Sequence, residues 1–375
     1  MFIFGFIINR IMADDKFNVT PWDVTGKVDY SRIISEFGVE PISDELLKRI
    51  EKITGKNFML DRKIFFAHRD LKWLLDEYEK GHKFFLYTGR SPSGPIHIGH
   101  LMVWQFTKFL QDAFDVELWF QFPDEEKFLF KKDFSFEDAQ KYLHENMLDI
   151  IALGFDPKKT HFIIDTKHAG LMYGEACKVA KKLTFSMVKS SFGLGESSNI
   201  GEIFYTSMQA VPAFLPSILK GKKIPCLIPH AVDQDPHFRL TRDILPKLGH
   251  YKPASVQCSF LPPLTGASGK MSSSEEDAAI YATDSPKEVE NKIKRYAFSG
   301  GRDTLEEHRR HGGNPDVDVS FQYLRYMFEP DDKKLKEIYN DYKSGAMTSG
   351  ELKQIAIDKI NAFLKEHQKK RQAAK

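Results

Sequence analysis

The sequence predicts an α/β fold: a doubly wound parallel sheet, with an N-terminal extension before it and an all-helical domain after it. Between about residues 81 and 282, short apolar segments alternate with amphipathic ones, as strands alternate with helices around a parallel sheet. After residue 283 the amphipathic segments continue, but no strand pattern follows. We therefore expect an extension over 1–80, an α/β domain over 81–282 and a helical domain over 283–375.

The predicted strands are short apolar segments bounded by polar turns, the pattern of strands that are buried on both faces of a sheet. Five such segments occur, namely KFFLYT (83–88), VELWFQF (116–122), HFIID (161–165), PCLIP (225–229) and ASVQCSF (254–260). Ligands of doubly wound sheets bind at the carboxyl ends of the strands, so the residues that end these segments are candidates for a binding site.

The predicted helices have apolar residues at helical spacing and residues that begin or end a helix. Ser43 and Ser135 are placed to cap two of them, and Pro246 should kink or end another. Helices are expected at 43–54, 68–81, 96–114, 135–155, 236–249, 285–298, 319–328, 333–345 and 348–375.

Composition excludes several classes of protein. The formal net charge is +2, so a nucleic-acid partner must be held by a local patch and not by bulk charge. The three cysteines are far apart and form no CxxC pair. Their number and spacing argue against a disulfide framework or a zinc site and favour a reducing, cytoplasmic location.

The N-terminal segment MFIFGFII is apolar, but it is too short to span a membrane and no basic residue precedes it. We expect Met12 to be the native start, so that residues 1–11 lie upstream of it, and we expect no association with a membrane. A short signal or membrane anchor is the alternative.

The segment SPSGPIHIGH (91–100) joins the first strand to a helix through a loop of small residues. Free backbone N–H groups and the positive end of a helix dipole favour a phosphate at such a place. His97 and His100 lie three residues apart on one helix face, where each can donate to a phosphoryl oxygen. The segment matches neither a P-loop nor GxGxxG. Two alternatives remain: histidines that cap a helix, and a metal site that lacks a nearby third ligand.

Two short motifs resemble the signatures of class I aminoacyl-tRNA synthetases. The first is HIGH at 97–100, and the second is KMSSS at 270–274, about 170 residues further on and after the last predicted strand. The order of the motifs and their position beside strand ends match that family. Ser273 stands where the common second motif has lysine, so the loop lacks one positive charge while Lys270 remains.

Longer segments resemble the eukaryotic and archaeal tryptophanyl-tRNA synthetase family. They include LYTGRSPSGPIHIGHL, IPHAVDQDPHFRLTRD and KMSSSEEDAAIYATD, and the resemblance covers about residues 17–370. It implies a Rossmann-type catalytic domain that activates L-tryptophan with ATP, as its Mg²⁺ complex, to tryptophanyl-adenylate. The tryptophanyl group is then transferred to the terminal ribose of tRNA(Trp).

The resemblance also implies residue roles on the nucleotide side of the site. No protein-bound metal is expected, because the magnesium would arrive with ATP. The residues expected to act on the reacting phosphates are His97, His100, Lys270, Met271 and Ser272. The residues expected to bind the rest of ATP are Thr88, Gly89, Arg90, Gly99, Ala231 and Asp233, the last on the ribose hydroxyls.

Tryptophan needs an apolar slot with one acceptor, because its indole has one N–H donor and no acceptor. The resemblance assigns Tyr87 and Gln121, both at strand ends, to the indole nitrogen. It assigns Glu126, Gln209 and Gln234 to the α-amino group. Taken without the resemblance, Tyr87 is equally a core residue, and Glu126 is equally an acidic residue at a helix start.

The resemblance further implies a homodimer whose interface is the apolar, Gly- and Ser-interrupted segment at about 184–220. A helical hairpin buried within one chain is the alternative. The helical domain over 283–375 is implied to read the anticodon of the tRNA, without residues that the sequence can name.

Other readings of the sequence remain open at this stage. His230, Asp233, Asp235 and His237 could be read as metal ligands. A tyrosyl-tRNA synthetase shares the architecture, although its pocket would want a carboxylate for the phenol hydroxyl. A small nucleotidyltransferase and a non-catalytic RNA-binding relative are the alternatives from other classes.

Overall fold

The fold centres on a seven-stranded sheet in the order β3-β4-β9-β8-β5-β6-β7. The computed structural model describes residues 18–19, 24–25, 30–266, 269–271 and 276–375. The strands of the sheet are β3 (Glu40–Pro41), β4 (Phe65–Arg69), β5 (Phe85–Gly89), β6 (Glu117–Phe122), β7 (Thr160–Ile164), β8 (Cys226–Ala231) and β9 (Ala254–Cys258). A separate antiparallel pair consists of β1 (Asn18–Val19) and β2 (Val24–Thr25).

All five predicted strands are present as β5 to β9, and their pairings with one another are parallel. The chain leaves β5 for β6 and β7 on one side, then returns to place β8 and β9 on the other side. This is the doubly wound order, so the predicted fold class is confirmed.

The strands diverge at the point where the winding reverses. β5 pairs with β6 over its whole length, Phe85–Gly89, but with β8 only at Phe85 and Leu86. Beyond Leu86 the carboxyl ends of β5 and β8 are therefore free of each other, which opens a crevice at that edge of the sheet.

One part of the prediction is wrong, because the sheet is not wholly parallel. β3 and β4 come from the N-terminal 80 residues and pair antiparallel with each other, and β4 also pairs antiparallel with β9. His68 and Arg69, which the sequence assigned to the start of a helix, are the end of β4. The helix begins only at Leu71, after Asp70 has taken up a left-handed conformation with φ of 51°. The strand β4 could not be recognised in the sequence because its apolar residues pass directly into a helical pattern.

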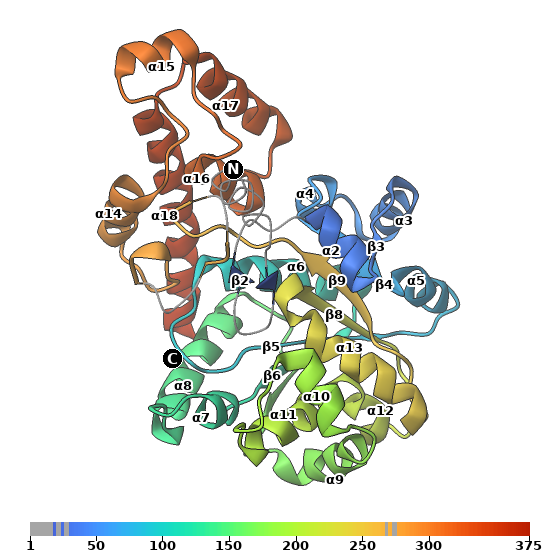
Figure 1. Cartoon of the computed structure of the whole chain (residues 1–375). Coiled ribbons are helices and arrows are strands. Elements are labelled where there is room, and N and C mark those ends of the chain that lie inside the picture. The colour runs from blue at the N-terminus through green and yellow to red at the C-terminus, as the bar shows by residue number, and fades with distance from the viewer. Residues whose placement is uncertain (1–17, 20–23, 26–29, 267–268, 272–275) are drawn as a thin grey trace, which may run out of the picture.

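Helices cover both faces of the sheet because alternate residues of each strand belong to different cores. Leu86, Leu118 and Leu227 face a large core that includes the helices before residue 155 and those of the C-terminal part. Phe85 and Ile228 face a second core, formed with the helices between β7 and β9. Figure 1 shows α9 to α13 gathered at one end of the molecule and α14 to α18 at the other.

Most predicted helices of the first 250 residues are confirmed, together with their capping residues. The Ser43 and Ser135 hydroxyls accept from the backbone N–H of Leu46 and Asp138. One helix ends at Ile244, just before Pro246, as predicted. The helices are α2 (Tyr30–Phe37), α3 (Asp44–Thr54), α4 (Phe58–Asp61), α5 (Leu71–Glu79), α6 (Ile98–Phe114), α7 (Glu126–Phe130), α8 (Phe136–Ala152), α9 (Ala169–Ala180), α10 (Phe185–Phe192), α11 (Ile200–Ala210), α12 (Leu215–Leu219) and α13 (Asp235–Ile244).

Single turns join several of these helices. They are η1 (Val211–Ala213), η2 (Val232–Gln234) and η3 (Leu245–Leu248). The turn η2 connects β8 to α13, so it lies at the carboxyl edge of the sheet, beside the crevice.

After β9, the elements of the described residues are helices, apart from one bridge between His97 and Tyr281. They are η4 (Glu276–Ala278), α14 (Pro286–Tyr296), α15 (Leu305–His311), α16 (Val319–Tyr323), the π-helical turn η5 (Leu324–Phe328), α17 (Asp332–Ser344) and α18 (Ser349–Ala373). The predicted helices of this part are confirmed. None of the helices in the described ranges has the length and apolar content that crossing a bilayer requires.

The long helix α18 returns to the α/β part and packs on α8. Asp149 on α8 lies 3.0 Å from the Nε2 of His367 and from the Nε of Arg371, and all three side chains are buried. The C-terminal helices and one face of the sheet therefore share a continuous core.

Candidate active site

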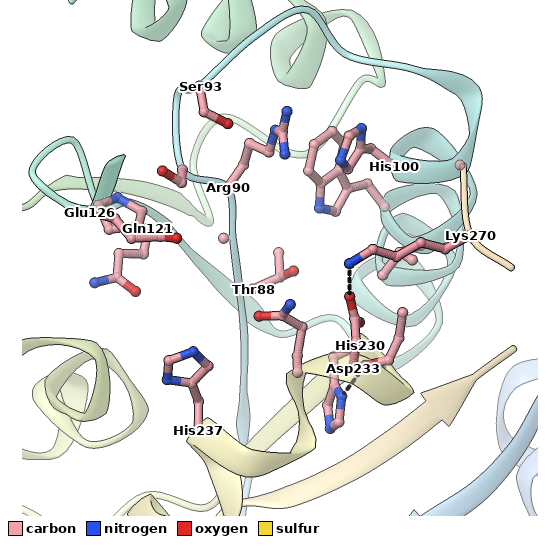
Figure 2. Close-up of a pocket in the computed structure, with 18 of the residues that line it drawn as sticks. Thr88, Arg90, Ser93, His100, Gln121, Glu126, His230, Asp233, His237 and Lys270 are labelled. Carbon is pink, nitrogen blue, oxygen red and sulfur yellow. Dashed lines mark hydrogen bonds and ion pairs between the residues drawn. The ribbon is translucent and has the colours of Figure 1, made fainter. Parts of the chain in front are cut away.

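A cavity of about 650 Å³ opens between the carboxyl ends of β5 and β8. Its wall includes the loop after β5, the start of α6, the ends of β6 and α11, the turn η2 and the residues 270–271. Figure 2 shows side chains from these separate segments around one hollow. The site-residue candidates that line it are Tyr87, Thr88, Gly89, Arg90, His97, Gly99, His100, Gln121, Glu126, Gln209, Ala231, Asp233, Gln234, Lys270 and Met271.

The structure thus brings together fifteen of the sixteen residues that the sequence singled out. The remaining candidate, Ser272, lies outside the described residues. These residues come from segments up to 184 positions apart, Tyr87 to Met271, so their meeting in one cavity depends on the tertiary fold.

The two histidines form one rim of the cavity. His97 is the N-cap of α6, and its backbone N–H donates to Nδ1 of His100 at 3.3 Å. The two rings stack with centroids 3.6 Å apart. A side chain at Gly99 would place a Cβ 3.1 Å from the His97 ring, a tight contact that favours glycine beside the stacked rings.

A second segment holds this rim in place. The N–H of Ile98 donates to the carbonyl of Ile280, and the N–H of Ala282 donates to the carbonyl of Ile96. Residues that follow the KMSSS motif are therefore joined by backbone hydrogen bonds to residues of the HIGH motif. The prediction that the two motifs meet at one site is consistent with this contact.

Both imidazoles are neutral at pH 7. Burial lowers the pKa of His97 and of His100 well below the ordinary value, and the positive charges of Arg90 and Lys270 lower both further. Because Nδ1 of His100 accepts a hydrogen bond, the neutral ring carries its proton on Nε2. Each ring can therefore donate one N–H to an anion without itself being charged.

Two cationic side chains lie in the same cavity. Arg90 follows β5, and burial lowers its pKa to about 10, so it stays charged at neutral pH. Lys270 reaches across the crevice to Asp233 of η2, with Nζ and Oδ2 3.0 Å apart (Figure 2). Met271, next to it, is buried, and its backbone N–H donates to the carbonyl of Leu261. These two contacts hold the first residues of the KMSSS motif against the rest of the fold.

Deeper in the cavity, a buried tyrosine and a buried glutamine present hydrogen-bonding atoms. The Tyr87 hydroxyl donates to Oε1 of Gln121 at 2.5 Å and accepts from Nε2 of Gln209 at 3.2 Å. Gln121 is fully buried and Tyr87 is 1% exposed. Their strands approach closely at this point, since a Cβ at Gly89 would lie 2.8 Å from the carbonyl oxygen of Gln121.

An anionic group lies beside the Tyr87–Gln121 pair. Glu126 is buried at the start of α7 and forms an ion pair with Lys127 at 2.6 Å. Burial alone would raise its pKa, but the Lys127 ammonium outweighs this and lowers the pKa of Glu126 below its ordinary value. A charged carboxylate at this place suits a cationic ligand group.

The sequence matches the model of one protein family, tRNA synthetases class I (W and Y), over residues 79–365. The chain belongs to this family. It is 52% identical to the tryptophan--tRNA ligase of Sulfolobus acidocaldarius over 97% of this chain and 94% of that one. The resemblance drawn from the HIGH and KMSSS motifs is therefore confirmed.

Solved structures of the synthetase family agree with the fold. The tryptophanyl-tRNA synthetase of Plasmodium falciparum is 43% identical, with a TM-score of 0.87 over 92% of this chain and 94% of that one. The enzyme of Encephalitozoon cuniculi, solved bound to tryptophan, is 40% identical with a TM-score of 0.84 over the same shares. Both likenesses extend over the C-terminal helices as well as the sheet.

The reading of the β8–α13 turn of this synthetase as a metal site is not supported. Within the described residues, no three His, Cys, Asp or Glu side chains are grouped so that they could hold a metal ion. Asp235 instead pairs with Arg69 at 2.9 Å and accepts from Nε2 of Gln257 at 2.7 Å, and Asp233 pairs with Lys270. Protein cations and amides occupy the carboxylates that a metal would need.

Several residues of the site were missed by the sequence interpretation. The hydroxyl oxygen of Tyr205, on α11, lies 2.7 Å from Oε1 of Gln209 and 3.2 Å from Oε2 of Glu126. Asp165, directly after β7, accepts from Nε2 of Gln121 at 2.7 Å. The signal for Asp165 was present, because an acidic residue ended an apolar strand next to the strand that carries Gln121.

The neutral state of the paired histidines predicts how stability depends on pH. In the unfolded chain these imidazoles take up protons below about pH 6.5, whereas in the folded state they do so only at much lower pH. The free energy of unfolding should therefore fall between pH 7.5 and 5.5, by about 1.4 kcal/mol for each histidine. In urea denaturation, the free energy of unfolding of a His100→Asn variant should fall over this pH range by about 1.4 kcal/mol less than that of the wild type. Equal losses in the two proteins would contradict the neutral imidazole.

Proposed function

We propose that this synthetase is a tryptophan–tRNA ligase that forms tryptophanyl-adenylate from L-tryptophan and ATP and transfers the tryptophanyl group to the 3′-terminal ribose of tRNA(Trp). The observation that carries the proposal is the cavity in which the Tyr87–Gln121 pair and the His97, His100 and Lys270 rim occur together. The names of the relatives, tryptophan--tRNA ligases that match over 94% of their own length, support it.

In the first step, a carboxylate oxygen of tryptophan attacks the α-phosphorus of ATP, and the bond from that phosphorus to the bridging oxygen breaks to release pyrophosphate. The protein needs to supply no nucleophile. Positioning of the two substrates and stabilisation of the developing charge account for the rate. Magnesium that enters with ATP would neutralise part of the triphosphate charge, and we assign it no protein ligand.

The phosphate side of the cavity has donors in place for this charge. The N–H groups of neutral His97 and His100 lie at the N-terminus of the seventeen-residue helix α6, where the helix dipole also favours an anion. Arg90, which is half-buried, adds a positive charge on the same side of the cavity. The remaining nucleotide residues proposed from the sequence, Thr88 and Ala231, line the space between β5 and β8.

Lys270 is paired with Asp233, and this contact links the two halves of the nucleotide site. We assign Asp233 to the ribose hydroxyls, which would donate to its carboxylate and weaken its hold on the lysine. Lys270 would then move to the phosphates, where its charge is most useful in the transition state. Nucleotide binding and positioning of the second motif are coupled in this way.

The amino-acid side of the cavity suits tryptophan better than tyrosine. The indole N–H needs an acceptor, and both Oε1 of Gln121 and the Tyr87 oxygen belong to residues that line the cavity and can accept a further hydrogen bond. Glu126, Gln209 and Gln234 would accept from the α-ammonium. A phenol hydroxyl would call for a carboxylate at this depth, but Gln121 stands between the cavity and Asp165.

Partners and location belong to the same proposal. The C-terminal helices α14 to α18 would bind the anticodon arm of the tRNA. A cytoplasmic location agrees with three free cysteines, of which Cys177 is exposed.

A C₂ homodimer is supported by apolar side chains on the surface of α9, α10 and α11. The exposed side chains are Leu171 (52% exposed), Tyr173 (61%), Phe185 (41%) and Ile200 (79%). α9 and α11 pack on each other, so this apolar surface is shared between them. It begins before residue 184, earlier than the segment proposed from the sequence.

ATP–pyrophosphate exchange with each amino acid tests the proposed substrate. Tryptophan should support exchange, and kcat/KM for tyrosine should be lower by roughly 10⁴-fold, because tyrosine leaves the buried hydrogen-bonding groups unpaired. Exchange with tyrosine but not with tryptophan would refute the assignment of Tyr87 and Gln121.

Removal of the Lys270 ammonium tests the role of the second motif. A Lys270→Ala variant should form the adenylate more than tenfold more slowly in single-turnover experiments, since it loses a charge that acts on the phosphates in the transition state. Lys158→Ala, an exposed lysine just before β7 and far from the carboxyl edge, is the matched control and should react at the wild-type rate. An unchanged rate in Lys270→Ala would remove this residue from the mechanism.

Analytical ultracentrifugation tests the dimer. At micromolar concentration the protein should sediment with twice the chain mass of 43.2 kDa. Ile200→Asp combined with Tyr173→Asp should shift it to the monomer, because two charges would be buried in the proposed interface. Leu305→Asp, equally exposed at 63% but on α15, should leave the mass unchanged. A monomeric wild type would contradict the proposal.

A further inference from the structure

The amide of Gln121 can work as an indole acceptor in only one of its two orientations. Its Oε1 faces the Tyr87 hydroxyl, and its Nε2 donates to Oδ2 of Asp165 at 2.7 Å. The reversed amide would present N–H groups to the cavity, opposite the N–H of an indole. Because Gln121 is fully buried, each of its polar groups that lost a hydrogen bond would stay unpaired and destabilise that orientation. The group that decides the orientation is the one that accepts from Nε2.

Asp165 is fixed at the right place by the sheet. β6 and β7 are adjacent and parallel, with Phe122 opposite Ile164, and the N–H of Asp165 donates to the carbonyl of Phe122. The side chain is 1% exposed. Its second oxygen, Oδ1, has no hydrogen-bond partner among the described residues when both neighbouring carboxyls are ionised.

The turn after β6 brings the carboxyl of Glu125 beside that of Asp165. Asp124 accepts from the backbone N–H and the hydroxyl of Thr166, the residue that follows Asp165. This contact ties the turn 123–126 to the end of β7 and places the Glu125 carboxyl against that of Asp165. Both oxygens of Glu125 are also buried without another hydrogen-bond partner in the described part of the chain.

Two ionised carboxylates can only accept hydrogen bonds, so they cannot satisfy each other. A single proton between them changes this, because the protonated carboxyl donates to the ionised one. We propose that Glu125 and Asp165 share one proton, and that this carboxyl pair holds the Gln121 amide with its oxygen directed to the substrate. The inference rests on the proposed function, since it concerns how that site selects tryptophan.

Electrostatics of the surroundings agree with a shared proton. Burial raises the pKa of Glu125 to about 7, and burial together with the Glu125 charge raises the pKa of Asp165 well above its ordinary value. The titratable groups that face the pair are Asp124 and Glu126 on the same turn, Tyr87 on β5 and Tyr205 on α11. None of these is a cation that could stabilise two negative charges, so the pair retains a proton near neutral pH.

The two carboxyls therefore have different parts. Asp165 accepts from Nε2 of Gln121 through Oδ2, and the shared proton lies between its Oδ1 and the carboxyl of Glu125, which touches no substrate-binding group. Both are positioning residues, because they act on the substrate through Gln121. The pair explains how a glutamine, whose amide has no inherent preference between its two ends, can serve as a specific acceptor for one N–H.

The test compares L-tryptophan with its benzothienyl analogue, in which sulfur replaces the indole N–H. Isothermal titration calorimetry should show Asp165→Asn weakening tryptophan binding at least tenfold, and binding of the analogue less than threefold. The loss is selective because only tryptophan uses the oriented acceptor. Asp133→Asn makes the same chemical change on the surface and should alter neither Kd. Equal losses for the two ligands would overturn the proposal, since they would mean that Asp165 only supports packing.

A second variant tests the proton itself. Wild-type affinity for tryptophan should fall at least threefold as the pH rises from 7 through the raised pKa of Asp165, because the pair then loses the proton that it shares. Glu125→Gln carries a permanent N–H donor in place of that proton, so its affinity should not change over this range. A Glu125→Gln variant that loses tryptophan affinity as Asp165→Asn does would exclude the shared proton. Its pH profile also decides the matter if Asp165→Asn fails to give a cooperative melting curve.

The same titrations separate this inference from the function on which it rests. A wild-type protein that binds tryptophan and supports exchange, but whose variants behave against expectation, contradicts the carboxyl pair alone. A wild-type protein that binds no tryptophan contradicts the proposed function first.

Discussion

The reversal of winding between β5 and β8 is the constraint on which the rest of the structure depends. The two strands pair only at Phe85 and Leu86, whereas β5 and β6 pair over five residues. Beyond Leu86 the two strands have no paired residues, so the edge between β5 and β8 is open. Tyr87 to Arg90 on one side and Asp233 and Gln234 on the other therefore face one space.

Charged side chains lie on both proposed sides of the cavity. Arg90 and the Lys270–Asp233 pair lie with the N-terminus of α6 on the side proposed for the nucleotide, and the Glu126–Lys127 pair lies on the side proposed for the amino acid. The two histidines contribute hydrogen-bond donors without adding charge, because burial, together with the nearby cations, lowers the pKa of both imidazoles. Lys270 in turn pairs with Asp233, so its charge has a defined partner within the protein.

Local patterns were sufficient to predict the five parallel strands, the caps at Ser43 and Ser135 and the helix end before Pro246, because each depends on residues close in sequence. The antiparallel strands β3 and β4 could not be predicted in this way. Their place depends on the pairing of β4 with β9, almost 200 residues further on, and FFAHR carries no alternation that distinguishes a sheet edge from the start of a helix.

The site shows the same division between local and tertiary information. The motifs HIGH and KMSSS marked the nucleotide rim because their residues are consecutive in sequence. The Lys270–Asp233 pair and the Gln121–Asp165 hydrogen bond join residues that are 37 and 44 positions apart, and no spacing rule links them. The sequence indicates Asp165 only as the end of a strand, because its role depends on its hydrogen bond with Gln121 on the neighbouring strand.

The most direct measurement is a crystal structure of the protein with tryptophan and a non-hydrolysable ATP analogue. The account predicts the indole nitrogen within hydrogen-bonding distance, about 2.7–3.2 Å, of Oε1 of Gln121 or the Tyr87 hydroxyl. It also predicts a triphosphate between the two histidines and a Lys270 that has left Asp233. A triphosphate bound away from the β5–β8 crevice, or an indole ring turned with its nitrogen away from Gln121, would contradict it.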